Sequence, residues 1–207
     1  MRTIKNLFII ATALLTSQSI QAQSSAMKDP VSFKLKNGLT VIVAENQSAS
    51  KVFSSFNSEA QPSVSKTGAQ EVLTAILNTT AGQLAQQVSF SEKGGNINAV
   101  SSDFDMALQA LSTSVQQPTM DQEVFDTCKA ELIKSIEARD RYYAPELTVA
   151  AVEALTLNDI RSLHHDLMVP SSIYLTIAGN ISLTDAKLLA KKSFGNWKGT
   201  DAIEISK

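Results

Sequence analysis

Two short runs of alternating apolar residues flank a turn, and they constrain the fold more than any other part of the chain. Their apolar positions are Phe33, Leu35, Leu39, Val41 and Val43. Between the runs lies Lys36-Asn37-Gly38, and Asn-Gly is the strongest short-range signal for a hairpin of antiparallel strands. Because alternation places every second side chain on one side of a sheet, one face of this hairpin is predicted to be buried.

The rest of the chain mixes helical and strand periodicity. Apolar spacing predicts helices over residues 66–81, 103–116, 121–141, 156–169 and 182–194, and strands over 52–56, 96–101 and 172–178. A polar helix is also expected over 82–93, and Pro145 is expected to begin a short helix that ends at Leu155. Gly94-Gly95 is predicted to end the helix over 82–93, and Met106 is assigned to the inner face of the helix over 103–116. This mixture predicts an α+β fold, with helices packed on one face of a mixed or antiparallel sheet.

Composition indicates one ordinary globular domain. The chain has 207 residues, of which 43% are hydrophobic and 18% charged, with a formal net charge of −2. There is no basic stripe of the kind that binds nucleic acid. Since no repeat, linker or low-complexity segment divides the chain, we expect a single domain over residues 31–199 and a short tail over 200–207.

The first residues are typical of a secretory signal peptide. Arg2 and Lys5 precede a nine-residue apolar core over residues 7–15, which is too short to span a bilayer. We expect cleavage after Ala22, a flexible stretch over 23–30, and a periplasmic or secreted protein that leaves the membrane; a retained anchor is the alternative. Cleavage would remove two positive charges, so the net charge of −2 would become −4.

Cys128 is the only cysteine, so no disulfide within one chain is possible. It falls on the apolar side of the predicted helix 121–141. We interpret it as a buried small hydrophobic residue rather than a reactive thiol.

The order of these elements resembles one half-domain of the insulinase/pitrilysin family of zinc peptidases. The stretches that carry the likeness are FKLKNGLTVIVAEN, GAQEVLTAILNTTAG, LQALSTSVQQPTMDQEVFDTCKAEL, LTLNDIRSLHHDLMVPSSIYLTIAGNIS and AKKSFGNWKG. Together they cover most of residues 31–199. The resemblance implies the family's α+β half-domain fold, and Trp197 is expected to fasten the last helix as a packing residue.

The helix at residues 66–81 departs from the family at the decisive positions. Active members carry the zinc motif H-x-x-E-H there. The corresponding residues are Glu71, Val72, Leu73, Thr74 and Ala75. Both histidines and the general-base glutamate are missing, so we expect no catalytic residues, no metal ligands and no cofactor. Glu71 has no identifiable partner and is interpreted as a solvated carboxylate.

The chain also lacks segments that the family usually has. A second strand is expected after 96–101, and a longer connection before residue 156; neither is present. Complete family chains hold two half-domains, whereas this chain holds one. These absences put the completeness of the sheet in question.

Three other groups of residues have side chains that could carry chemistry. Glu137 stands where the family's third zinc ligand is expected, but without histidines we interpret it as an exposed helical residue. His164 and His165 are adjacent, so they point about 100 degrees apart on a helix and cannot share one metal as an i, i+4 pair would. Residues 139–143, Arg-Asp-Arg-Tyr-Tyr, are either a contact patch or a charged helix end.

Three functions follow from the resemblance and the missing motif. The first is an exported, non-catalytic protein that is an accessory or substrate-binding partner of a zinc peptidase, with a peptide substrate shared between them. The second is a free-standing binding or structural module. The third is a zinc hydrolase that uses other ligands, which scattered carboxylates and two adjacent histidines make the least favoured.

Overall fold

The computed structural model describes residues 27–139 and 147–199, and within them the chain forms one six-stranded mixed sheet. The strands are β1 (Val31–Lys34), β2 (Thr40–Glu45), β3 (Val52–Ser58), β4 (Val88–Ser91), β5 (Gly94–Ala99) and β6 (Ile173–Gly179). Their order across the sheet is β1-β2-β6-β3-β5-β4. β2 and β6 are parallel, and the other neighbouring pairs are antiparallel. The predicted hairpin is confirmed as β1 and β2, and the sheet forms despite the missing segments.

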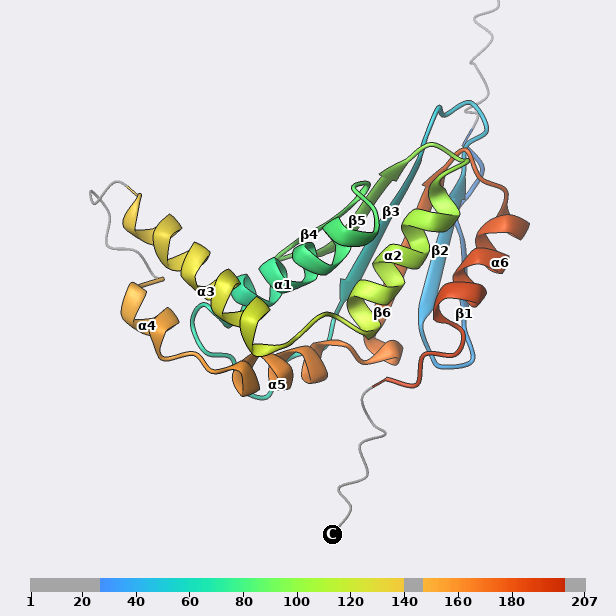
Figure 1. Cartoon of the computed structure of the whole chain (residues 1–207). Helices are drawn as coiled ribbons and strands as arrows, with labels where there is room; N and C mark the ends of the chain where they lie inside the picture. The colour runs from blue at the N-terminus through green and yellow to red at the C-terminus, as the bar shows by residue number, and fades with distance from the viewer. Residues whose placement is uncertain (1–26, 140–146, 200–207) are drawn as a thin grey trace, which may run out of the picture.

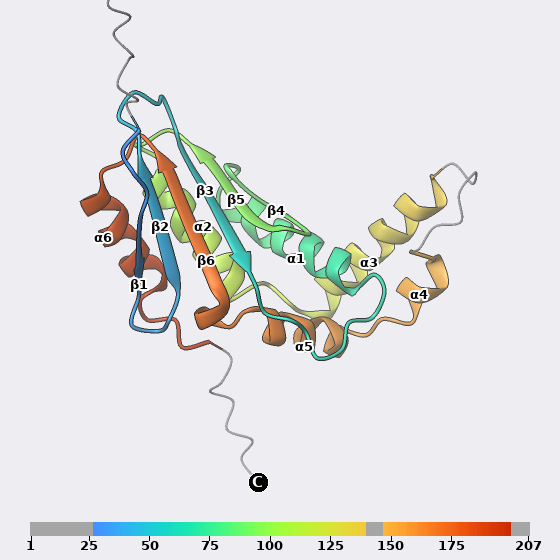
Figure 2. The ribbon, with the colours of Figure 1, turned by 180° about the vertical axis from the view of Figure 1, so that it is seen from behind.

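Helices cover one face of this sheet and leave the other open. The helices are α1 (Ala69–Leu84), α2 (Phe104–Gln116), α3 (Gln122–Glu137), α4 (Val149–Glu153), α5 (Leu157–Leu167) and α6 (Leu183–Phe194). α1, α2 and α6 lie on the same side of the strands, while α3 and α4 project beyond one end of the sheet (Figure 1). From behind, the strands are in full view (Figure 2). The α+β prediction with helices on one face is confirmed.

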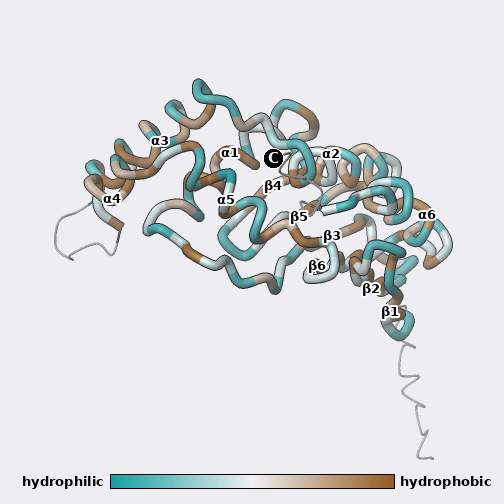
Figure 3. The backbone as a smooth tube through the Cα atoms, turned by 90° about the horizontal axis from the view of Figure 1, so that it is seen from below, coloured by the Kyte–Doolittle hydropathy of each residue, from teal (hydrophilic) through white to brown (hydrophobic). Residues whose placement is uncertain are grey.

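The hydrophobic core is made by side chains of the helical layer and the sheet. Seen from below, the helices α1, α2 and α3 lie on one side of the strands (Figure 3). An aromatic cluster joins the two layers. Phe56 of β3 stacks on Phe194 of α6 at 5.9 Å between ring centroids, and Trp197 lies 6.2 Å from each of them. Trp197 is buried, so its predicted packing role is confirmed.

Two helix starts follow from their sequences. Thr156 and Asp159 form a reciprocal capping box at the start of α5. Lys66 forms an ion pair of 2.7 Å with Asp159, and its hydrogen bond, with those of Thr156, lowers the pKa of Asp159 to about 2. Asp121 accepts a hydrogen bond from the Val124 N–H and so caps α3.

The helix predicted over residues 82–93 is wrong beyond Leu84. β4 occupies Val88–Ser91, where Val88 and Phe90 are buried and Ser89 and Ser91 are exposed. Gly94-Gly95 does not end a helix but begins β5. A Cβ atom at Gly95 would lie 2.7 Å from the Phe90 ring and 2.9 Å from Leu111, so the glycine lets these side chains approach the sheet.

Three smaller corrections concern the helices. Met106 is 56% exposed and does not belong to the inner face of α2. α3 ends at Glu137 rather than near residue 141. The short helix expected from Pro145 is α4, which begins at Val149 with Thr148 as its N-cap; Pro145 itself lies outside the described residues.

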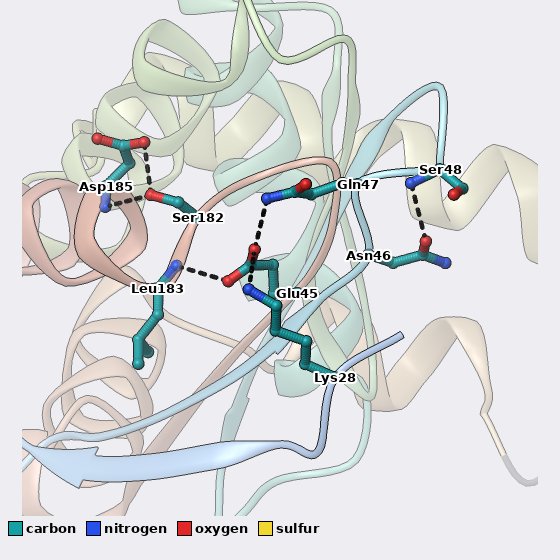
Figure 4. A network of polar contacts seen from close by, with 8 residues as sticks. All are labelled: Lys28, Glu45, Asn46, Gln47, Ser48, Ser182, Leu183 and Asp185. Carbon is teal, nitrogen blue, oxygen red and sulfur yellow. Dashed lines mark hydrogen bonds and ion pairs between the residues drawn. The ribbon is translucent and has the colours of Figure 1, made fainter. Parts of the chain in front are cut away.

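Glu45 at the end of β2 ties three segments together (Figure 4). Its carboxylate accepts hydrogen bonds from Lys28 at 2.7 Å and Gln47 at 2.8 Å, and from the backbone N–H of Leu183 at 3.4 Å. The bond from Lys28 holds the pKa of Glu45 below its ordinary value. Lys28 therefore attaches residues 27–30, which we expected to be flexible, to the sheet, as does the bridge between Met27 and Asn46.

The predicted signal peptide, its cleavage site and the tail over 200–207 lie outside the described residues. In the part of the chain that is described, no helix is both long and apolar enough to cross a membrane.

Candidate functional site

The helix position of the family's zinc motif lies beside the turn between β4 and β5. α1 buries Ala69, Val72, Leu73, Ile76 and Leu77 against the core. The opposite side carries Glu71, Thr74 and Ala75, which line a hollow of about 480 Å³ together with Asn78, Ser91 at the end of β4, and the turn residues Glu92 and Lys93. The three motif positions are therefore brought together and are accessible, as they would need to be in a peptidase.

The chemistry of this hollow differs from that of a zinc site. Catalytic zinc takes three protein ligands, usually His with Glu, Asp or Cys, and Glu71 is the one such side chain at the motif positions. Glu137 is exposed and does not line the hollow. Among residues 27–139 and 147–199, no three His, Cys, Asp or Glu side chains are grouped so that they could hold a metal ion.

Asn78 closes the free edge of β4, a role that the sequence analysis missed. Its Nδ2 donates to the Phe90 carbonyl at 2.9 Å, and its Oδ1 accepts from the Phe90 N–H at 2.7 Å. β4 is an edge strand, so the Asn78 amide stands where the peptide group of a further strand would pair. Asn78 lies one helical turn after the motif positions, so a side chain of α1 blocks part of the β4 edge beside the hollow.

Asn78→Ala is expected to lower the free energy of unfolding by about 1–3 kcal/mol, because two backbone groups of Phe90 lose their partner. The measurement is urea unfolding followed by circular dichroism. Asn98→Ala is the matched control: Asn98 is exposed on β5, and its change is expected to stay within about 0.5 kcal/mol. Equal effects of the two substitutions would show that the Asn78 amide does not hold the edge.

The two histidines are separated by burial, which confirms that they do not face one site. His164 is buried, and its Nε2 lies 2.8 Å from the Val115 carbonyl oxygen at the end of α2. His165 is exposed, with Nδ1 3.5 Å from an Asp166 oxygen. His164 therefore connects α5 to α2 as a neutral hydrogen-bonding residue.

Burial lowers the pKa of His164 below its ordinary value of 6.5, so the folded protein resists protonation there. The stabilisation is present above about pH 6.5 and is lost as the pH falls, because the unfolded chain binds the proton more readily. Urea unfolding at about pH 8 and about pH 5.5 should show this loss. His164→Gln should weaken the pH dependence, whereas His165→Gln should retain it.

The uncovered face of the sheet is the second candidate surface, and we call it the open face. Its members come from β3, β5 and β6: Phe53, Ser55, Asn96, Asn98, Thr176 and Ala178. Strand register places Ser55 between Asn96 and Thr176, and Phe53 between Asn98 and Ala178. Together these residues line a shallow hollow of about 290 Å³. The face is mostly polar, and Phe53 is 50% exposed near its centre.

Cys128 lies in the core, whereas the cluster over 139–143 follows α3. Cys128 is buried, its Sγ lies 3.7 Å from Thr79 Oγ1, and burial raises the pKa of the thiol. The prediction of a buried, unreactive cysteine agrees with this environment. Arg139 is exposed just after α3, and residues 140–143 of the cluster lie outside the described residues.

Comparison with known proteins agrees with this arrangement. Residues 154–207 match the family model of the peptidase M16 inactive domain. A protease from Helicobacter pylori superimposes with a TM-score of 0.73 at 14% identity, over 87% of this chain and 53% of the protease. The fold is that of a peptidase M16 half-domain. The resemblance to the insulinase/pitrilysin family, whose members are the M16 peptidases, is thereby confirmed.

Two further structures have the same M16 half-domain fold. The peptidase M16 inactive domain from Pseudomonas fluorescens matches with a TM-score of 0.70 at 14% identity, over 83% of this chain and 52% of that one. The first half of the periplasmic protease PqqL from Escherichia coli gives 0.64 at 10% identity, over 82% and 46%. The chain spans about half the length of each of these structures. No curated protein matches its sequence significantly.

Proposed function

We propose that this protein is an exported, non-catalytic M16-type half-domain that pairs with a catalytic zinc peptidase subunit and helps to bind the polypeptide substrate. The observation that carries the proposal is the combination of an M16 half-domain fold with Glu71, Thr74 and Ala75 at the zinc-motif positions. A half-domain fold favours association with a second half-domain, while the motif residues include no set of three ligands for the metal.

The open face supports pairing with another half-domain. The uncovered face of an antiparallel sheet is normally polar and solvated, but here it also carries a large exposed aromatic ring among small polar side chains. Ser, Thr and Asn side chains can hydrogen-bond to a polypeptide main chain without demanding a particular sequence. Phe53 supplies an apolar contact of the kind that anchors interfaces.

Export is supported by two observations. The first residues have the basic start and short apolar core of a signal peptide. One matching structure, PqqL, is a periplasmic protease. We therefore place the proposed complex in the periplasm.

The test is affinity purification of the tagged chain from periplasmic extract of its own organism, with bound proteins identified by mass spectrometry. We expect near-stoichiometric recovery of an M16 peptidase that carries an intact H-x-x-E-H motif. Phe53→Asp should abolish this recovery, because it places a charge at the centre of the open face. Met106→Asp is the matched control on the helical side, where the methionine is 56% exposed, and it should leave recovery unchanged.

If Phe53→Asp and Met106→Asp reduced recovery of the peptidase equally, this result would contradict the use of the open face. Recovery of the chain alone, eluting as a monomer by light scattering, would contradict the accessory role.

A free-standing binding module is the second candidate, and one structural observation favours it. The open face is mostly polar, and Asn78 closes the β4 edge, so the half-domain does not require a partner to cover either. This candidate predicts a soluble monomer that binds extended peptides at the open face. If the monomer binds peptides and Phe53→Asp abolishes this binding, the free-standing module would be favoured over the accessory subunit.

A further inference from the structure

A hollow rich in lysine lies at the opposite end of the sheet from the zinc-motif helix. It has a volume of about 730 Å³ and lies between the β1–β2 hairpin and α6. We call it the lysine hollow because five lysines line it: Lys34, Lys36, Lys187, Lys191 and Lys192. Asn37 fixes the two walls relative to one another, since its side-chain amide donates to the carbonyls of Phe194 and Trp197 at 2.8 and 2.9 Å.

The charge of this hollow is opposite to that of the chain as a whole. The protein has 18 basic and 20 acidic residues, yet five of the ten residues lining the hollow are lysines and none is acidic. Lys192 is bonded to Asp105 at 2.9 Å. Within residues 27–139 and 147–199, the other four lysines have no carboxylate partner. Such a cluster attracts anionic groups.

The floor and rim of the hollow add apolar contacts. Phe33 is half-buried, and Lys187 Nζ lies 5.2 Å from its ring centroid. Leu188 is 65% exposed at the rim. A ligand that combines carboxylates with a chain able to cover Phe33 and Leu188 would fit this surface better than a small inorganic anion.

β1 presents an unpaired strand edge next to the same hollow. Leu35 N–H donates to the Leu39 carbonyl, and the register pairs Phe33 with Val41 and Ser32 with Ile42. Hydrogen-bonded and non-hydrogen-bonded pairs alternate in an antiparallel ladder. The backbone N–H and C=O groups of Ser32 and Lys34 therefore point away from β2, toward the free edge.

Local effects account for part of the lysine cluster. A lysine on an edge strand discourages aggregation, which explains Lys34, and cations near a helix C-terminus are favourable, which explains Lys191 and Lys192. Neither effect places Lys36 and Lys187 on the same hollow. The presence of Lys36 and Lys187 beside the other three lysines on one hollow needs a further reason.

We propose that the lysine hollow and the free edge of β1 bind an extended segment of another polypeptide that carries acidic residues at alternate positions. The segment would add to the sheet as a strand beside β1, through main-chain hydrogen bonds to Ser32 and Lys34. Because side chains alternate across a strand, every second residue would point toward α6, and carboxylates there would meet Lys187, Lys191 and Lys192 of that helix. This surface lies at the edge opposite β4 and is independent of the function proposed above.

The test uses the full mature chain and a fluorescein-labelled peptide of about ten residues that alternates glutamate and threonine. Fluorescence anisotropy should report binding that weakens as salt is raised, and a lysine–threonine peptide should not bind. Lys187→Glu with Lys191→Glu should weaken binding at least about tenfold, or about 1.4 kcal/mol. Lys51→Glu with Lys134→Glu is the charge-matched control, on residues outside the hollow, and should leave the affinity unchanged.

Strand addition is tested separately from charge. A glutamate–threonine peptide that is N-methylated at alternate residues keeps its carboxylates but cannot pair along one edge, so it should bind at least about tenfold more weakly. Ser32→Pro, which removes an outward N–H at an edge position, should weaken the unmethylated peptide similarly. Equal binding of the methylated and unmethylated peptides would overturn strand addition. If the control variant Lys51→Glu with Lys134→Glu lost as much peptide affinity as Lys187→Glu with Lys191→Glu, the lysine hollow would not be the binding site.

Discussion

Phe56→Ala is expected to lower the free energy of unfolding by about 3–5 kcal/mol, the range for removing a large buried aromatic side chain. Phe56 is 1% exposed and contacts both Phe194 and Trp197. Its loss would leave a cavity where the sheet, α6 and the segment after α6 meet, and the two remaining rings would lose their partner. Urea unfolding monitored by Trp197 fluorescence measures the change, because Trp197 is the only tryptophan.

Phe53→Ala provides the control for this prediction on the same strand. Phe53 lies three residues before Phe56 but on the open face, where half of its surface is exposed. Its truncation is expected to cost at most about 1 kcal/mol, as for other exposed positions. A cost for Phe53 as large as that for Phe56 would mean that the open face is covered in solution by another copy or by a partner.

Gly94→Ala is expected to destabilise the protein by about 2–6 kcal/mol. Gly94 has φ of +124°, and a Cβ atom there would lie 2.1 Å from the Phe56 carbonyl oxygen. Backbone strain contributes about 1–3 kcal/mol and the forced shift of packed groups a similar amount. The expected result is a lower midpoint in thermal unfolding, with disruption centred on the pairing of β3 with β5.

Gly82→Ala is the control, and its effect should have the opposite sign. Gly82 lies within α1, and a Cβ atom there would meet no other atom within 4 Å. Alanine is a better helix former than glycine by about 0.5–1 kcal/mol, so this variant should be more stable than the wild type. If Gly94→Ala were as well tolerated as Gly82→Ala, the close approach of β5 to β3 would not exist in solution.

Elements with a local signal could be predicted from the sequence. The β1–β2 hairpin follows from its alternation and its Asn-Gly turn, α1 from apolar residues at helical spacing, and α5 from the Thr156 capping box. β4 could not be predicted in the same way. It is four residues long, and its two buried side chains, Val88 and Phe90, are too few to establish a period of two.

The absence of the H-x-x-E-H residues could be read directly from the sequence, because it depends only on residue types at aligned positions. The Asn78 contact could not, since it joins a helical side chain to the backbone of a strand that was itself missed. A signal existed: an Asn inside a helix competes with its own backbone and suggests a specific partner. The open face corresponds to alternating Ser and Asn residues in β3 and β5, a pattern that could be interpreted only once the strands were known.

The position of β6 between β2 and β3 determines when this molecule can fold. β2 and β3 are close in sequence, yet each pairs with residues 173–179, which are more than 110 positions further along the chain. During synthesis, the centre of the sheet cannot close until those residues have left the ribosome. Until then, β2 and β3 each have an unpaired edge, so the nascent chain depends on chaperones for longer than a protein built from sequential hairpins.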